Sequence, residues 1–98
     1  MIQHTVVFRL KHPSGSPEEA AFLDKARALR HVPGVLDFRV RREIGRKNPY
    51  AFGLSMHFLS EDAYRAYDAH PDHRRFVEEV WLKEVDDFLE IDYDESDL

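Results

Sequence analysis

Histidine is the residue type that most invites a chemical interpretation in this chain, which has six histidines among 98 residues and no cysteine. The absence of cysteine excludes a thiol nucleophile, a disulfide framework and a cysteine-ligated zinc site. A neutral imidazole on an apolar surface meets the needs of a general base, because desolvation keeps it uncharged and a hydrogen-bond partner sets its tautomer. His4, His70 and His73 occupy positions where this chemistry is conceivable.

Each of these three histidines also has a structural interpretation. His4 is the lone polar residue on a strongly apolar strand face, where a buried histidine with satisfied hydrogen bonds is the commoner case. His70 and His73 flank Pro71, with Tyr67 shortly before them. A spacing of three could support a metal ion, but no third ligand has a suitable spacing, so we expect no metal site. The other histidines are assigned to the surface (His12, His31) or to the core or an interface (His57).

The residues alone indicate an acid–base pocket and exclude several other kinds of site. His73 precedes Phe76 and Val77 by three and four residues, so it belongs to the inward face of its helix. An imidazole there, with the Tyr67 phenol nearby, suits general acid–base work. The chain has no nucleophile elbow and no glycine-rich phosphate loop, and it places no pair of carboxylates inside a cleft.

Hydrophobic periodicity predicts the elements that must position these side chains. A period-two alternation, in which Val6 and Phe8 share the apolar face of the first segment, is typical of strands with one buried face. Helices are predicted where Ser16 and Ser60 can cap a first turn and where Pro71 opens one. The expected strands are 2–10, 35–44, 50–58 and 86–93, and the expected helices are 17–31, 61–69 and 71–84.

This order of elements predicts one α+β domain over residues 1–98. The sequence β-α-β-β-α-β is the split βαβ, or ferredoxin-like, arrangement, with a four-stranded antiparallel sheet. Helices then cover one face of the sheet and leave the other face half-polar and uncovered. A second copy of the chain packing on that face is the simplest way to complete so small a fold, which buries only about 60–70% of its unfolded surface.

Composition and charge limit the kinds of partner that we expect the chain to bind. The chain is 43% apolar and 34% charged, with a net charge of −5, and no apolar run reaches the roughly 20 residues of a membrane span. With no signal peptide, we expect a cytoplasmic protein that binds neither membranes nor nucleic acid, since a pI of 5.6 is unsuited to phosphate binding. Basic residues predominate over 25–47 and acidic residues over 84–97, a distribution that suits pairing between two copies.

Four segments of the chain resemble the stress-responsive A/B barrel domain, or Dabb, family. They are 1–10 (MIQHTVVFRL), 32–35 (VPGV), 66–73 (AYDAHPDH) continuing through 76–77 (FV), and 91–93 (IDY). The resemblance covers nearly the whole chain, and its His-Pro-x-His segment is the most specific part. It implies a ferredoxin-like protomer, a two-fold homodimer whose sheets close an α+β barrel, and a pocket between sheet and helices.

The resemblance also implies roles for individual residues, because the plant olivetolic acid cyclase of this family catalyses an aldol closure without a cofactor. His73 matches its general base, Tyr67 a tyrosine that orients the substrate, and Asp92 the acidic residue that holds the histidine. His4 matches a first-strand histidine, whereas Phe52 and Lys25 replace a histidine and a tyrosine of that pocket. The expected substrate-binding residues are Val6, Phe8, Phe52, His70, Phe76 and Val77.

Three functions follow as expectations. The first is a homodimer that binds a small, partly apolar molecule and performs cofactor-independent lyase, cyclase or isomerase chemistry with His73 as base. The second is a non-catalytic stress-response or ligand-carrier module, in which the histidines only satisfy one another. The third is a small dimeric monooxygenase-like enzyme, a pattern that the single tryptophan, Trp81, fits poorly.

Overall fold

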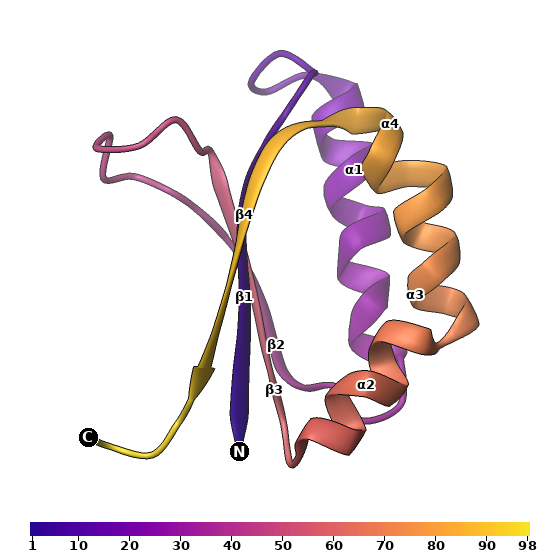
Figure 1. The fold of residues 1–98 in the computed structure, drawn as a ribbon. Helices are drawn as coiled ribbons and strands as arrows, with labels where there is room; N and C mark the ends of the chain where they lie inside the picture. The colour runs from indigo at the N-terminus through magenta and orange to yellow at the C-terminus, as the bar shows by residue number, and fades with distance from the viewer.

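A computed structural model describes all of residues 1–98 and shows a four-stranded sheet with every helix on one of its faces (Figure 1). The strands are β1 (Ile2–Leu10), β2 (Leu36–Arg42), β3 (Phe52–Phe58) and β4 (Val85–Asp94). The helical segments are α1 (Pro17–Arg27), the 3-10 turn η1 (Ala28–His31), α2 (Glu61–Ala69), α3 (Pro71–Phe76), the π-helical η2 (Val77–Trp81) and α4 (Leu82–Glu84). The predicted ferredoxin-like fold is confirmed.

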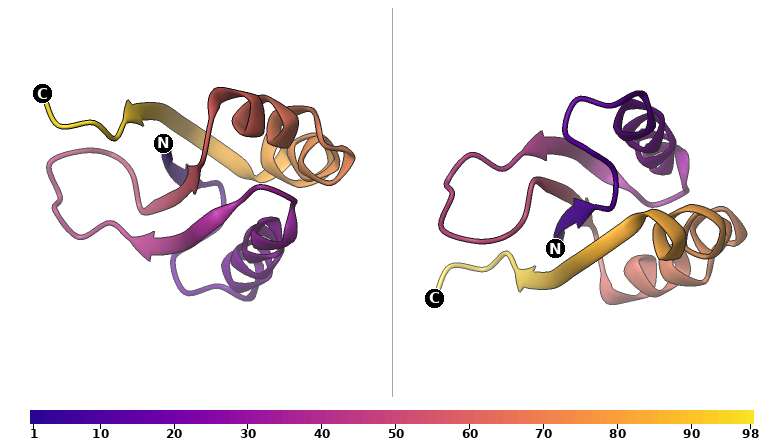
Figure 2. Two further views of the ribbon diagram at one scale, coloured as in Figure 1. Left: turned by 90° about the horizontal axis from the view of Figure 1, so that it is seen from below. Right: turned by 90° about the horizontal axis from the view of Figure 1, so that it is seen from above.

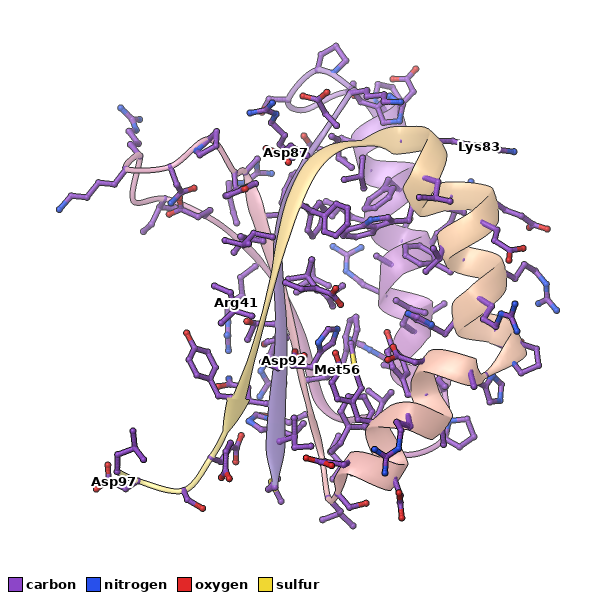
Figure 3. The ribbon with its side chains drawn as sticks, viewed as in Figure 1. Arg41, Met56, Lys83, Asp87, Asp92 and Asp97 are labelled. Atoms are coloured by element: carbon purple, nitrogen blue, oxygen red, sulfur yellow. The ribbon has the colours of Figure 1, made fainter.

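The strands run in the order β2-β3-β1-β4, and each neighbouring pair is antiparallel. The most apolar strand, β1, therefore lies between two partners, and its alternate residues are buried. The register places Met56 of β3 on one side of His4 and Asp92 of β4 on the other. Met56 points from the sheet into the layer between the sheet and the helices (Figure 3).

Local capping interactions determine where the helices begin. The Ser16 hydroxyl accepts a hydrogen bond from the Glu19 amide at 3.2 Å, and the Ser60 hydroxyl accepts one from the Ala63 amide at 3.1 Å. Each removes one unpaired amide from a first turn. The expected helix over 71–84 is continuous, but its middle turn, η2, is π-helical, which the sequence pattern does not predict.

An aromatic cluster fills the layer between the sheet and the helices. The Phe8 ring lies 5.0 Å from the Trp81 ring and 5.7 Å from the Phe22 ring, and Phe22 lies 5.9 Å from Phe76. These separations are typical of favourable tilted aromatic pairs. Strand β1, helix α1 and the α3–η2 segment are thus joined through Phe8, Phe22 and Trp81.

The opposite face of the sheet carries no helix, as the end-on views make plain (Figure 2). The loop between β2 and β3 extends toward this helix-free side, and Arg41 projects there as well (Figure 3). On β4 the side chains of Leu89, Ile91 and Tyr93 are exposed. The expected uncovered face is confirmed. None of the helices has the length and apolar character that crossing a membrane requires.

The aromatic cluster predicts a large cost for truncating Phe22, which has no exposed surface. Phe22→Ala should lower the free energy of unfolding by about 3–5 kcal/mol, because it removes buried apolar area and leaves a cavity. Urea denaturation followed by circular dichroism measures the change. Leu59→Ala, at a side chain that is 69% exposed, is the matched control and should stay within about 0.5 kcal/mol of the parent protein. Equal effects of the two substitutions would contradict this description of the core.

Candidate active site

A cavity of about 260 Å³ lies between the sheet and the α3–η2 segment. Its lining is mostly apolar and includes Val6, Phe76 and Val77, all three expected from the sequence. Its polar side chains come from different elements: His4 from β1, Tyr67 from α2, His73 from α3 and Glu90 from β4. Further apolar residues complete the wall, among them Leu29, Leu54, Trp81 and Phe88. Small-molecule sites commonly have this composition, with few polar groups in an apolar setting.

His4 is held at the sheet side of the cavity by two neighbours. It is 3% exposed, and its Nδ1 lies 2.6 Å from Oδ1 of Asp92. The Tyr64 hydroxyl donates to Oδ2 of Asp92 at 2.9 Å and lies 2.8 Å from the same Nδ1. The remaining ring atom, Nε2, lies 3.8 Å from Oε1 of the cavity residue Glu90. Nε2 is therefore the atom of His4 that faces the cavity.

His73 approaches the cavity from the helical side. Its Nδ1 lies 3.1 Å from the backbone carbonyl oxygen of Asp68, which can only accept a hydrogen bond. Nδ1 therefore donates, and Nε2 keeps the lone pair that a base requires. The Tyr67 ring lies near both histidines, with its centroid 4.3 Å from that of His73 and 6.3 Å from that of His4.

The expectation that Asp92 holds His73 is wrong. Asp92 bonds to His4 and Tyr64, and the Asp68 carbonyl occupies the corresponding place at His73. The physical reason is the register between β1 and β4, which sets Asp92 directly opposite His4 with both side chains on the helix-covered face. Reading β4 by itself places Asp92 on the correct face but does not identify its partner.

Three of the expected substrate-binding residues do not line the cavity. Phe8 has no exposed surface and belongs to the aromatic cluster. Phe52 is 3% exposed and packs against Phe8, with the Arg42 guanidinium 5.0 Å from its ring centroid. His70 caps α3, because its Nδ1 accepts a hydrogen bond from the Asp72 amide at 3.1 Å. Core packing and helix capping thus account for these side chains.

The other three histidines lie outside the cavity lining. His12 is paired with Glu84, His31 is exposed, and His57 on the helix-free face contacts Glu95. No group of three or more histidine, aspartate or glutamate side chains is arranged to hold a metal ion.

Two residues of the site were not expected from the sequence, although signals for both exist. Tyr64 lies one helical turn before Tyr67, so both side chains share one face of α2. Glu90 lies two residues before Asp92, so it shares the inward face of β4. Both patterns describe a face of an element, and only the tertiary arrangement shows that these faces meet at His4.

Burial makes Tyr64 and Tyr67 weaker acids than an ordinary tyrosine. Desolvation, followed by the hydrogen bond to the Asp92 carboxylate, raises the pKa of Tyr64 well above its ordinary value. Desolvation also raises the pKa of Tyr67, and the nearby carboxylates of Asp68 and Glu90 add to the shift. Tyr67 therefore stays a neutral hydroxyl that can donate a hydrogen bond inside the cavity.

This shift predicts how Tyr67 titrates. At about pH 11, one unit above the ordinary tyrosine pKa of about 10, Tyr67→Phe should leave the tyrosinate absorbance of the folded protein unchanged. In urea the same substitution should remove the signal of one of the four tyrosines. The pKa of Tyr67 is higher in the folded state than in the unfolded state. The buried neutral Tyr67 therefore contributes fully to stability below about pH 10, and this contribution is lost as the pH rises further. A folded parent protein with more tyrosinate than Tyr67→Phe at that pH would contradict the burial argument.

Comparison with known proteins identifies relatives of the chain in sequence and in fold. The chain is 27% identical over 95 residues to a stress-response A/B barrel domain-containing protein of Arabidopsis thaliana. That alignment covers 95% of this chain and 36% of the plant protein, so the chain spans about a third of the length of this curated relative. A Dabb family protein of ferredoxin-like fold from Mesorhizobium loti superimposes with a TM-score of 0.94 at 48% identity, covering 98% of this chain and 97% of that one.

Two more distant structures share the fold. A dimeric ferredoxin-like protein of unknown function from Thermobifida fusca has a TM-score of 0.75 at 22% identity, with 94% of this chain and 88% of that one covered. A hydroxynitrile lyase from Passiflora edulis has a TM-score of 0.83 at 14% identity, with 99% and 96% covered. Residues 2–95 match the stress responsive A/B barrel domain, and the chain therefore belongs to this family, Dabb.

Proposed function

We propose that the protein binds a small, partly apolar molecule in its cavity and catalyses a proton-transfer reaction on it, without a cofactor and with His73 as the base. The observation that carries the proposal is that His4 and His73 enter one apolar cavity from different layers of the fold. An apolar wall excludes water and strengthens each polar contact made inside it. Two imidazoles in such surroundings can serve one bound molecule.

The cavity limits the size and charge of that molecule. A cavity of about 150 Å³ accepts benzene, whereas drug-sized ligands occupy about 300–1,000 Å³. At about 260 Å³, the cavity suits a molecule larger than benzene and smaller than a typical drug. Glu90 is the only carboxylate in the lining, and it would repel an anionic ligand. A neutral compound with one carbonyl or hydroxyl group fits these limits.

A lyase-type or aldol-type step can be written with these residues. In a lyase-type step, His73 Nε2 removes the hydroxyl proton of the substrate, and the electron pair left on oxygen forms the carbonyl as the adjacent carbon–carbon bond breaks. In an aldol-type step, it removes a proton from an activated carbon, and the released electron pair forms the enolate. The neutral Tyr67 hydroxyl donates a hydrogen bond to the oxygen where charge develops. The Passiflora edulis enzyme, a hydroxynitrile lyase, indicates that this fold can carry lyase chemistry. Positioned acid–base groups of this kind supply about 10²–10⁴-fold in rate.

Cleavage of mandelonitrile tests this proposal, because the compound is a neutral aromatic hydroxynitrile of suitable size. The release of benzaldehyde, followed by its absorbance, should show turnover by the parent protein. His73→Ala should lower kcat by about 10²-fold or more, since the base is lost. His31→Ala, at an exposed histidine outside the cavity, is the matched control and should retain the parent rate.

Other results of this experiment would count against catalysis. Equal rates for the parent protein and His73→Ala would remove His73 from the base role. Saturable binding of mandelonitrile with no turnover above the solvent rate would favour the alternative of a non-catalytic ligand carrier.

The proposal includes a homodimer formed through the helix-free face. Leu89, Ile91 and Tyr93 of β4 are 49%, 38% and 52% exposed there, a cluster that is unusual for the surface of a monomer. The two edge strands of the sheet carry opposite charges, since β2 is basic and β4 is acidic. The β2 of one copy can therefore complement the β4 of another. The dimeric Thermobifida fusca protein shares this protomer fold.

Ile91→Asp tests the dimer, because it places a carboxylate inside the exposed apolar cluster of β4, where burial against a second copy would remove its hydration. Size-exclusion chromatography with light scattering should report a dimer for the parent protein and a monomer for Ile91→Asp. Leu59→Asp places the same charge at an exposed site directly after β3 and should remain dimeric. A dimer that survives Ile91→Asp at micromolar concentration would place the interface elsewhere.

A further inference from the structure

His4, Asp92 and Tyr64 form a cluster that separates two hollows of the molecule. His4 lines the apolar cavity, whereas Asp92 and Tyr64 line a second, more polar hollow near the start of α2. The His4 side chain is 4% exposed and that of Asp92 is 41% exposed. One side of the cluster thus faces the candidate active site, and the other side is open to water. Asp92 is labelled on β4 in Figure 3.

The hydrogen bonds within this cluster determine which ring nitrogen of His4 carries the fixed proton. The Tyr64 hydroxyl donates to Oδ2 of Asp92, so its own oxygen presents lone pairs toward His4. Nδ1 of His4 then faces two acceptors, the Tyr64 oxygen at 2.8 Å and Oδ1 of Asp92 at 2.6 Å. A nitrogen lone pair at that position would face only other lone pairs. A proton on Nδ1 satisfies all three groups.

We propose that Asp92 and Tyr64 are positioning residues that keep Nδ1 of His4 protonated and direct its Nε2 into the cavity as the second acid–base atom. The inference builds on the proposed function, in which His73 is the base. It gives Asp92 the task that the third member of a catalytic triad performs: it orients an imidazole and balances its charge without becoming protonated itself. Tyr64 orients the carboxylate in turn.

The proton balance of a lyase step shows what His4 would contribute. His73 Nε2 takes the hydroxyl proton of the substrate, and the electron pair left on oxygen forms the carbonyl as the carbon–carbon bond breaks. The departing carbon group keeps the electron pair of that bond and receives a proton from Nε2 of the reacting form of His4. In that form the ring is protonated on both nitrogens, and Asp92 balances its charge. After product release, His73 loses its proton to water and His4 regains one, which restores both residues. No oxidant, reductant or metal takes part in this step.

Nitrogen NMR of the ligand-free protein tests the positioning role independently of any turnover. The neutral ring distinguishes the two tautomers, so the measurement is made above the ordinary histidine pKa of about 6.5. In ¹⁵N-labelled protein, long-range ¹H–¹⁵N correlations should show neutral His4 protonated at Nδ1 and unprotonated at Nε2. In Asp92→Asn the tautomer should change so that most His4 rings carry the proton on Nε2, as free histidine does. The His73 signals should stay unchanged, because Asp92 does not contact that ring.

Two further variants serve as a control and as a second test of the His4 tautomer. Asp94→Asn removes a neighbouring carboxylate that accepts from the Ser96 amide, and it should leave His4 as in the parent protein. Tyr64→Phe provides a second variant if Asp92→Asn fails to fold, and it should speed the exchange of the Nδ1 proton with water. A parent protein with His4 protonated at Nε2 alone, or an Asp92→Asn protein in which only His73 changes, would overturn the inference. If the parent protein shows the proton on Nδ1 of His4 but does not turn over mandelonitrile, the proposed function is contradicted and the positioning role is left intact.

Discussion

The candidate site depends on one interaction, the pairing of the last strand with the first. β1 and β4 lie side by side in an antiparallel register that sets Asp92 opposite His4 and Glu90 opposite Val6. A buried imidazole without a partner costs about 1–3 kcal/mol, so His4 is tolerated in the apolar layer because β4 supplies its carboxylate. The same strand supplies Phe88 and Glu90 to the cavity wall. Any change that slips this register would dismantle the His4 cluster and the cavity together.

The helical layer provides the other half of the site through packing. Helix α2 brings Tyr64 to His4 and Tyr67 to the cavity, and the cap formed by His70 determines where α3 begins, two residues before His73. The π-helical turn that follows directs Trp81 into the aromatic cluster. These rigid contacts hold His73 and His4 at one cavity from separate layers. A preorganised pair of this kind is what proton-transfer chemistry requires, because orientation is established before the substrate arrives.

Periodicity predicts the elements well, because alternation and helical spacing depend on neighbours within one segment. Such local rules predict strand β1, the Ser16 and Ser60 caps, the helix over 61–69 and the inward-facing position of His73. Side-chain partners are not local, and here the prediction fails. The partner of Asp92 depends on a register between residues 88 positions apart, and Phe8 and Phe52 belong to the core because of where helices pack on the sheet. The order of the elements predicts the fold, and the resemblance to the Dabb family points to Asp92, whereas the contacts among the site residues come from the structure.

The central claim is that His4 and His73 serve one ligand in one cavity, and a titration with benzaldehyde tests it most directly. The compound is neutral, slightly larger than benzene and carries a single carbonyl group. The ring signals of all six histidines can be followed by NMR as it is added. The account predicts that His4 and His73 shift together with a common Kd, while His12 and His31 stay unchanged. Shifts at only one of the two cavity histidines, or equal shifts at all six, would contradict it.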